Sequence, residues 1–79
     1  MIPAAIELFL RELGLVTRLT DEGEIEVYTR TGTGMNGLLT VQDGQVRALY
    51  HPVGTWAVEL VDPDSLDKLA SLCTLYANL

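Results

Sequence analysis

The sequence predicts an α+β fold, a two-layer sandwich of a helix, a five-stranded antiparallel meander and a second helix, with both helices on one face of the sheet. Apolar residues recur at helical spacing near the two ends, over 3–13 and 63–77. Between them lie short apolar runs separated by the turn signals D-E-G and D-G, which predict two hairpins plus one further strand. A chain of 79 residues is expected to form a single domain over 1–79.

The first helix is predicted over 3–13. Pro3 suits a first helical position, and Gly14 supplies a residue that adopts the left-handed conformation at a helix end. The residues at helical spacing, with Leu8 as a second apolar edge, are Ile6, Phe9, Leu10 and Leu13.

The first hairpin joins 15–20 to 24–30 through D-E-G, a three-residue loop ending in Gly. This loop predicts a register in which paired residue numbers sum to 44. One face then carries the pairs Leu15–Thr29, Thr17–Val27 and Leu19–Ile25. The other face carries Val16–Tyr28 and Arg18–Glu26. The apolar pairs and the opposite-charge pair arise from the same register, which supports it.

The second hairpin is predicted from 38–42 and 45–50 around Asp43 and Gly44, a strong hairpin signal. The expected cross-strand pairs are Val41–Val46 and Leu39–Ala48. Residues 51–54 (H-P-V-G) then predict a turn, and 55–61 predict the fifth strand.

The last helix is predicted over 63–77, with Asp62 as N-cap and Pro63 at the first helical position. Its polar positions form one narrow stripe, made of Asp64, Asp67, Lys68, Ser71, Thr74 and Asn78. The apolar remainder is wider than a helix needs when it packs on one side of a sheet. We therefore expect part of this helix to favour association.

The charge balance favours a basic partner. The chain has 11 acidic and 5 basic residues, a net charge of −6, and direct nucleic-acid binding is disfavoured because phosphates are held mainly by Lys and Arg. Glu7, Arg11 and Glu12 interrupt the apolar start, so we expect neither a signal peptide nor a membrane contact, and a cytoplasmic location. The single cysteine, Cys73, excludes an internal disulfide and a cysteine-based zinc site.

The segment G-T-G-M-N-G (32–37) matches the phosphate-binding pattern G-x-G-x-x-G. In dinucleotide-binding folds this pattern opens a helix, whereas here a strand is predicted after it. In kinases the next strand carries a lysine, whereas the only nearby cation here is Arg47. We interpret the segment as a connection between hairpins, with Met35 and Asn36 exposed at the crossing. An enzymatic function would require it to bind nucleotide.

Two acidic clusters stand out. Asp62, Asp64 and Asp67 are explained by helix capping. The hairpin cluster is the preferred electrostatic contact site, although an ordinary solvated turn is the alternative; its residues are Asp21, Glu22, Glu24 and Glu26. Neither cluster has the EF-hand spacing, and we predict no metal site and no cofactor.

The remaining chemistry-bearing residues do not indicate catalysis. His51 has no acidic neighbour in sequence, and Cys73 lies among leucines, as a small core residue does. Trp56 is interpreted as the main core aromatic, with an interface anchor as the alternative. Tyr28, on the face opposite Ile25, is predicted to be an exposed interface anchor.

In size, acidity and lack of catalytic residues, the whole chain resembles the small phage-encoded inhibitors of bacterial defence, anti-CRISPR proteins above all. The resemblance implies a protein-binding module in a bacterial host. Its carboxylates at Asp21, Glu22, Glu24 and Glu26 would replace phosphates on the nucleic-acid-binding surface of a basic protein or nucleoprotein complex, such as a CRISPR effector. The alternative is a homodimeric regulatory or chaperone-like domain, similar to the small acidic chaperones of bacterial secretion, that binds through its apolar helix surface.

Overall fold

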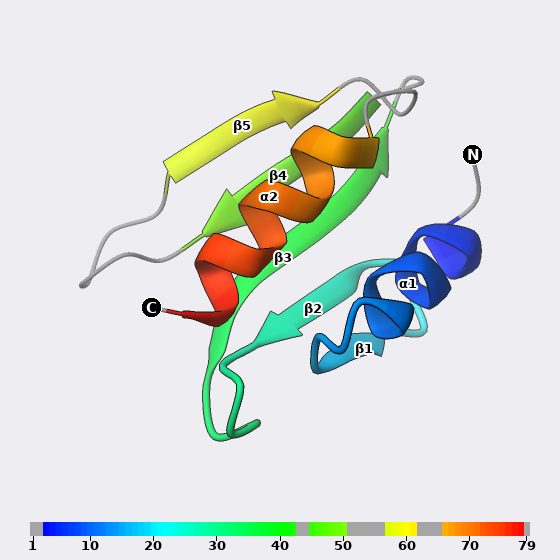
Figure 1. The fold of residues 1–79 in the computed structure, drawn as a ribbon. Coiled ribbons are helices and arrows are strands. Elements are labelled where there is room, and N and C mark those ends of the chain that lie inside the picture. Colours follow the sequence, from blue (N-terminus) through cyan, green and yellow to red (C-terminus); the bar gives the residue numbers. More distant parts are fainter. Residues whose placement is uncertain (1–2, 43–44, 51–56, 62–65, 79) are drawn as a thin grey trace.

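Two helices and an antiparallel sheet make up the α+β fold, as predicted (Figure 1). The computed structural model describes residues 3–42, 45–50, 57–61 and 66–78. The helices are α1 (Pro3–Glu12) and α2 (Leu66–Ala77). The strands are β1 (Thr17–Leu19), β2 (Ile25–Tyr28), β3 (Met35–Gln42), β4 (Gln45–Tyr50) and β5 (Ala57–Val61). They pair in the order β1-β2-β3-β4-β5.

Helix α1 starts at Pro3, as predicted, and its C-terminus is fixed by Gly14, whose φ is 85°. The amide of Gly14 donates to the carbonyl of Arg11 at 2.9 Å, and the amide of Leu15 donates to that of Leu10 at 3.3 Å. This pair of bonds is the Schellman motif, in which a left-handed residue closes the helix. Leu10 and Leu15 are both buried, so the residues on either side of the helix end pack into the core.

The first hairpin has the predicted register. Thr17 pairs with Val27, Arg18 with Glu26, and Leu19 with Ile25. Gly23 has a φ of 80°, the left-handed conformation expected of the last loop residue. Because side chains alternate along a strand, Ile25 and Val27 face the core while their neighbours face the other side of the sheet.

The second hairpin also has the predicted register, with Leu39 opposite Ala48 and Val41 opposite Val46. Strand β3 is longer than expected because it begins at Met35 and continues the pairing with β2. Its register with β2 shifts between Val27 and Tyr28, so that Asn36 is an extra, bulged residue. Strand β5 runs antiparallel beside β4, with the pairs from Val46–Val61 to Tyr50–Ala57.

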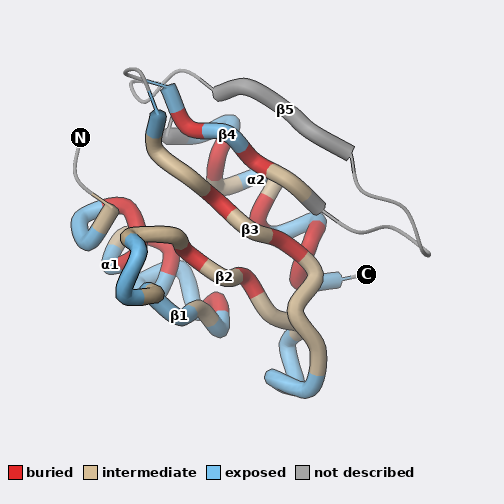
Figure 2. Tube along the Cα trace, turned by 180° about the vertical axis from the view of Figure 1, so that it is seen from behind, coloured by how far each residue is buried: buried red, intermediate tan, exposed pale blue. Residues whose placement is uncertain are grey.

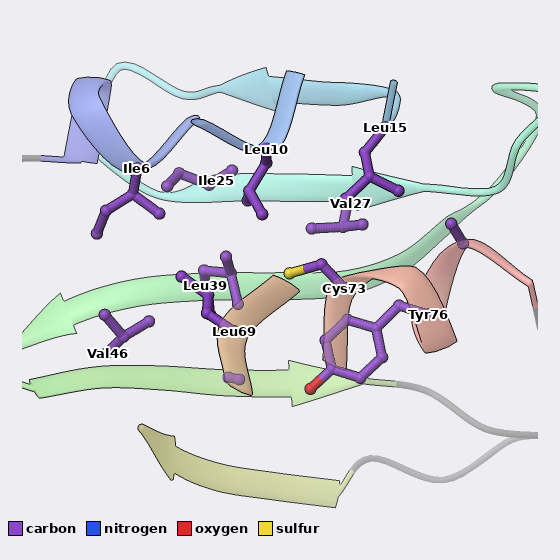
Figure 3. Packing of buried hydrophobic residues seen from close by; sticks show 12 residues of the cluster. Ile6, Leu10, Leu15, Ile25, Val27, Leu39, Val46, Leu69, Cys73 and Tyr76 are labelled. Atoms are coloured by element: carbon purple, nitrogen blue, oxygen red, sulfur yellow. The ribbon is translucent and has the colours of Figure 1, made fainter. Parts of the chain in front are cut away.

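Both helices contribute to one core on one face of the sheet. Figure 3 shows Ile6 and Leu10 of α1 and Leu69, Cys73 and Tyr76 of α2 directed toward the strands. The strand residues of this core are Ile25, Val27, Leu39, Val46 and Ala48. Their cross-strand registers place them on a single face. The opposite face, which is turned toward the reader in Figure 2, is not covered by either described helix.

The glycine-rich segment is in part the predicted connection between the hairpins and in part a piece of strand β3. Gly32 is left-handed, with a φ of 74°, and belongs to the connection between β2 and β3. Gly37 is buried inside β3, where a Cβ would lie 2.5 Å from Cδ2 of Tyr76. The expectation that Met35 and Asn36 are exposed at a crossing is wrong, because both are half-buried in β3.

Helix α2 is held at its C-terminal end by this same region of the chain. Asn36 donates through Nδ2 to the carbonyl of Tyr76 at 3.0 Å, and the amide of Arg30 donates to the carbonyl of Ala77 at 3.3 Å. The Arg30 side chain also donates through Nε to Oδ1 of Asn78 at 2.7 Å. The first two of these bonds satisfy backbone carbonyls that have no partner within the helix, and the third holds the side chain of Asn78.

Several predictions fall outside the described residues. They are the D-G turn at 43–44, the turn at 51–54 with His51, the aromatic Trp56, and the cap formed by Asp62, Pro63 and Asp64.

Candidate functional site

The cysteine considered for catalysis lies on helix α2. Cys73 is buried, and burial raises the pKa of its thiol to about 12, so the thiol is not a nucleophile at neutral pH. Among the described residues, no three His, Cys, Asp or Glu side chains gather where a metal ion could bind. Neither described helix is long and apolar enough to cross a bilayer.

The acidic hairpin tip, defined here as Asp21, Glu22 and Glu24, lies in the turn between β1 and β2. Asp21 and Glu22 are exposed, and Glu24 is half-buried. Two hydrogen bonds fix the turn: the amide of Thr20 donates to the carbonyl of Glu24 at 2.8 Å, and the amide of Glu24 donates to the side-chain Oγ1 of Thr20 at 3.1 Å. Within the described ranges, no basic side chain pairs with any of these three carboxylates.

Glu26 differs from the tip because its charge is already paired. Arg18 donates through Nε to Oε1 of Glu26 at 2.6 Å, and the hydroxyl of Tyr28 donates to the same oxygen at 3.0 Å. The hydrogen bond from Arg18 is the main reason that the pKa of Glu26 lies below its ordinary value, and Glu26 in turn raises the pKa of Arg18. The predicted Arg18–Glu26 pair is confirmed. Tyr28 is half-buried with its hydroxyl engaged, rather than a free exposed anchor.

The hairpin tip also lies against the start of α1. A Cβ on Gly23 would be 3.7 Å from Cγ of Pro3, the first residue of the helix. The loop thus contacts the start of α1, while Asp21 and Glu22 remain exposed to solvent.

A second surface adjoins the tip and was not identified from the sequence. It is the outer face, defined as the side of the sheet opposite the helices, with Arg18, Glu26, Tyr28, Leu38, Thr40, Arg47 and Leu49. Side-chain alternation extends this face to Glu24, the residue just before β2. Leu38 and Leu49 are directly paired and half-buried at its centre, and Arg47 is exposed. Side-chain alternation along 38–42 and 45–50 could have placed Leu38, Thr40, Arg47 and Leu49 on this face, given helices on the other face only.

The structure therefore brings the predicted contact residues together on one hairpin but separates their roles. Asp21 and Glu22 are exposed and pair with no cation among the described residues, whereas Glu26 and Tyr28 form a local network with Arg18 on the outer face. No family model, no curated protein and no solved structure matches this chain.

Proposed function

We propose that this chain is a non-enzymatic protein-binding module whose acidic hairpin tip occupies the nucleic-acid-binding surface of a basic protein or nucleoprotein complex. The observation that carries the proposal is the contrast in charge pairing along one hairpin. Glu26 is neutralised by Arg18 at 2.6 Å, while Asp21 and Glu22 are exposed and pair with no cation in the described residues.

Uncompensated surface charge of one sign is the feature that steers a chain toward an oppositely charged partner. A net charge of −6 extends this preference to the whole chain. Surfaces that bind nucleic acid are rich in Lys and Arg arranged for phosphates, and carboxylates at the end of a rigid hairpin supply similar charge. The resemblance to anti-CRISPR inhibitors suggests a CRISPR effector in a bacterial cytoplasm as one such partner.

The fold presents the tip on a rigid support. For the chain as a whole we infer the five-stranded meander, which the antiparallel register of β4 with β5 supports. The tip itself is constrained by the Thr20–Glu24 bonds and by the left-handed Gly23. A preorganised contact loses less conformational entropy on binding than a flexible one.

The test is an affinity capture with charge-matched variants. Asp21→Asn with Glu22→Gln removes two charges from the tip, and Glu12→Gln with Asp67→Asn removes two exposed charges from the helices. We expect the unaltered chain to capture basic proteins from a nuclease-treated bacterial lysate. Added single-stranded DNA or RNA should displace them, the tip variant should not capture them, and the helix variant should capture them normally.

Two results would contradict the proposal. If added nucleic acid does not displace the captured proteins, the chain does not occupy their nucleic-acid-binding surface. Equal loss of capture in both variants would mean that only the total charge matters and that the tip is not a contact site.

The alternative function is a chaperone-like or regulatory domain that binds partners through its helices. Exposed apolar side chains on the helix side favour it, because Leu8 is 55% and Leu75 is 49% exposed. Such a domain should slow the aggregation of a chemically reduced test protein. Leu8→Lys with Leu75→Lys should abolish that effect, and absence of any effect in the unaltered chain would exclude this alternative.

A further inference from the structure

The outer face of the sheet has an apolar centre that no described element covers. Leu38 of β3 lies directly opposite Leu49 of β4, and both are half-buried. The helices lie on the other side, as Figure 2 shows. Arg18, Glu26 and Tyr28 border this centre and satisfy one another's charges and hydrogen bonds, so they add little unpaired polarity to it.

Two unpaired charges of opposite sign lie in one row across this face. The β2–β3 register pairs Ile25 with Leu39, and its continuation places Glu24 beside Thr40. Thr40 in turn pairs with Arg47 of β4. Glu24 and Arg47 are therefore two strand spacings apart, about 10 Å, on either side of β3. Within the described residues, neither forms an ion pair.

This row becomes self-complementary under one particular symmetry. A two-fold axis parallel to β3, placed between two stacked sheets, exchanges β2 of one copy with β4 of the other. Glu24 of each copy then lies over Arg47 of the second copy, and Leu38 and Thr40 lie close to the axis. Stacked sheets are about 10 Å apart, a distance that a Glu and an Arg side chain can span together.

We propose that the outer face is a homodimer interface, in which Leu38 packs against its symmetry mate near the axis, Leu49 lies over Glu26 of the second copy, and two Glu24–Arg47 ion pairs fix the register. A two-fold interface uses the same patch on both copies, which is what this row provides. The interface goes beyond the proposed function, because Asp21 and Glu22 lie in the turn at the rim and remain available. The dimer presents Asp21 and Glu22 of both acidic hairpin tips, while Glu24 of each tip belongs to the interface.

A charge-swap experiment tests the interface without any partner protein. Sedimentation velocity at concentrations up to about 1 mM should show a dimer for the unaltered chain. Glu24→Lys alone and Arg47→Glu alone should each weaken dimerisation at least tenfold, since each places like charges over one another twice. The double variant, Glu24→Lys with Arg47→Glu, should restore dimerisation because the complementary pairs form again with reversed polarity.

The outcomes are decisive in both directions. A chain that stays monomeric at every concentration overturns the proposal, and so does a dimer that neither single variant weakens. Circular dichroism and unfolding in urea confirm that each variant is folded. Leu75→Lys is the matched control on the helix side and should leave the dimer intact. If it breaks the dimer while the charge variants do not, the interface is on the helices.

A cross-link provides an independent readout. Thr40→Cys introduces a thiol next to the proposed axis, whereas the native Cys73 is buried in the core. A short bis-maleimide should join two Thr40→Cys chains and should leave the unaltered chain uncoupled. Failure to cross-link a variant that sediments as a dimer would place the interface elsewhere.

Discussion

At the residue scale, Gly37 of β3 lies directly against the ring of Tyr76 of α2. It is the last glycine of G-T-G-M-N-G, yet it is needed for close packing and not for a flexible loop. The ring of Tyr76 occupies the space that a side chain would fill, with Cδ2 2.5 Å and Cγ 3.1 Å from an added Cβ. The buried ring cannot move aside without disturbing the core around it.

We therefore expect Gly37→Ala to lower the free energy of unfolding by about 1–3 kcal/mol, the usual cost of overpacking. Unfolding in urea, followed by circular dichroism, measures the change. Gly34→Ala is the matched control, because the nearest atom to its added Cβ is 4.0 Å away. Similar losses in the two variants would show that backbone effects, and not the Tyr76 ring, make glycine necessary at position 37.

Glu7 is a second residue whose role depends on a distant partner. Its side chain lies on α1 and is buried, with only 8% of the residue exposed. The hydroxyl of Thr17 donates to its Oε2, and Arg11 lies 3.6 Å from its Oε1. The carboxylate thus attaches α1 to the edge strand β1.

Thr17→Val keeps the shape of the side chain and removes the hydroxyl. We expect a loss of about 1–3 kcal/mol in the free energy of unfolding, since a buried carboxylate loses a donor. Thr74→Val, which removes an exposed hydroxyl bonded to the carbonyl of Ala70, should cost little by comparison. Equal effects in urea unfolding would mean that the Glu7–Thr17 bond has no special importance.

At the scale of elements, the β2–β3 connection serves as the C-terminal cap of α2. The bulge at Asn36 turns its side chain out of the regular strand pattern, and Nδ2 reaches the carbonyl of Tyr76. Asn36→Ala should lower stability by about 0.5–1.5 kcal/mol. It should also speed hydrogen exchange in the last turn of α2. Gln42→Ala, exposed at the other end of β3, should change neither quantity. Unchanged exchange in the Asn36 variant would contradict the capping role.

The first hairpin should show a pH dependence that comes from Glu26. Arg18 lowers the pKa of this carboxyl below its ordinary value of 4.5, so the charged form is favoured in the folded state. The resulting stabilisation is present above that ordinary value and disappears as the pH falls through the lowered pKa. The unaltered chain should therefore be more stable than Glu26→Gln at neutral pH, and the difference should shrink on acidification.

Urea unfolding across a pH series measures this difference. In an Arg18→Gln background the same Glu26→Gln comparison should depend much less on pH, because the guanidinium that lowers the pKa is absent. A pH dependence that survives without Arg18 would assign the effect to another group.

The elements that the sequence predicted well are those fixed by local interactions. The register of the first hairpin follows from the D-E-G loop and the alternation of its strands, and even the Arg18–Glu26 pair was predicted. The exposed carboxylates of Asp21 and Glu22 follow from the same register. The roles of Gly37, Asn36 and Glu7 were not predictable, because each depends on a residue brought close only by the tertiary fold. Side-chain alternation places Tyr28 on the outer face but does not indicate that its hydroxyl bonds to Glu26.

At the scale of the whole molecule, the two proposed surfaces have different physical characters. The outer face combines an apolar centre with charges that complement one another under a two-fold axis. The acidic hairpin tip carries charge of one sign at the rim of that face. A dimer formed through the first surface would bring two copies of the second to one partner. Such an arrangement raises the apparent affinity for a partner with repeated basic sites.

The net charge of −6 should also make stability depend on salt. Excess charge of one sign destabilises a compact state through repulsion, and salt screens that repulsion over about 8–10 Å at physiological ionic strength. Salt also weakens the Arg18–Glu26 and Glu7–Arg11 pairs of the described residues, but we expect the overall excess of charge to outweigh them. We therefore expect the free energy of unfolding to rise as sodium chloride increases from low to physiological concentration.

The charge-matched variants identify where this repulsion arises. Asp21→Asn with Glu22→Gln and Glu12→Gln with Asp67→Asn both change the net charge from −6 to −4. If repulsion is concentrated in the acidic hairpin tip, the first variant should lose most of the salt dependence and the second should keep most of it. Equal slopes would mean that repulsion is spread over the whole surface. Repulsion among the carboxylates of the tip would then be no stronger than repulsion elsewhere on the surface. Binding of a basic partner to the tip would in that case remove no more repulsion than binding at another acidic site.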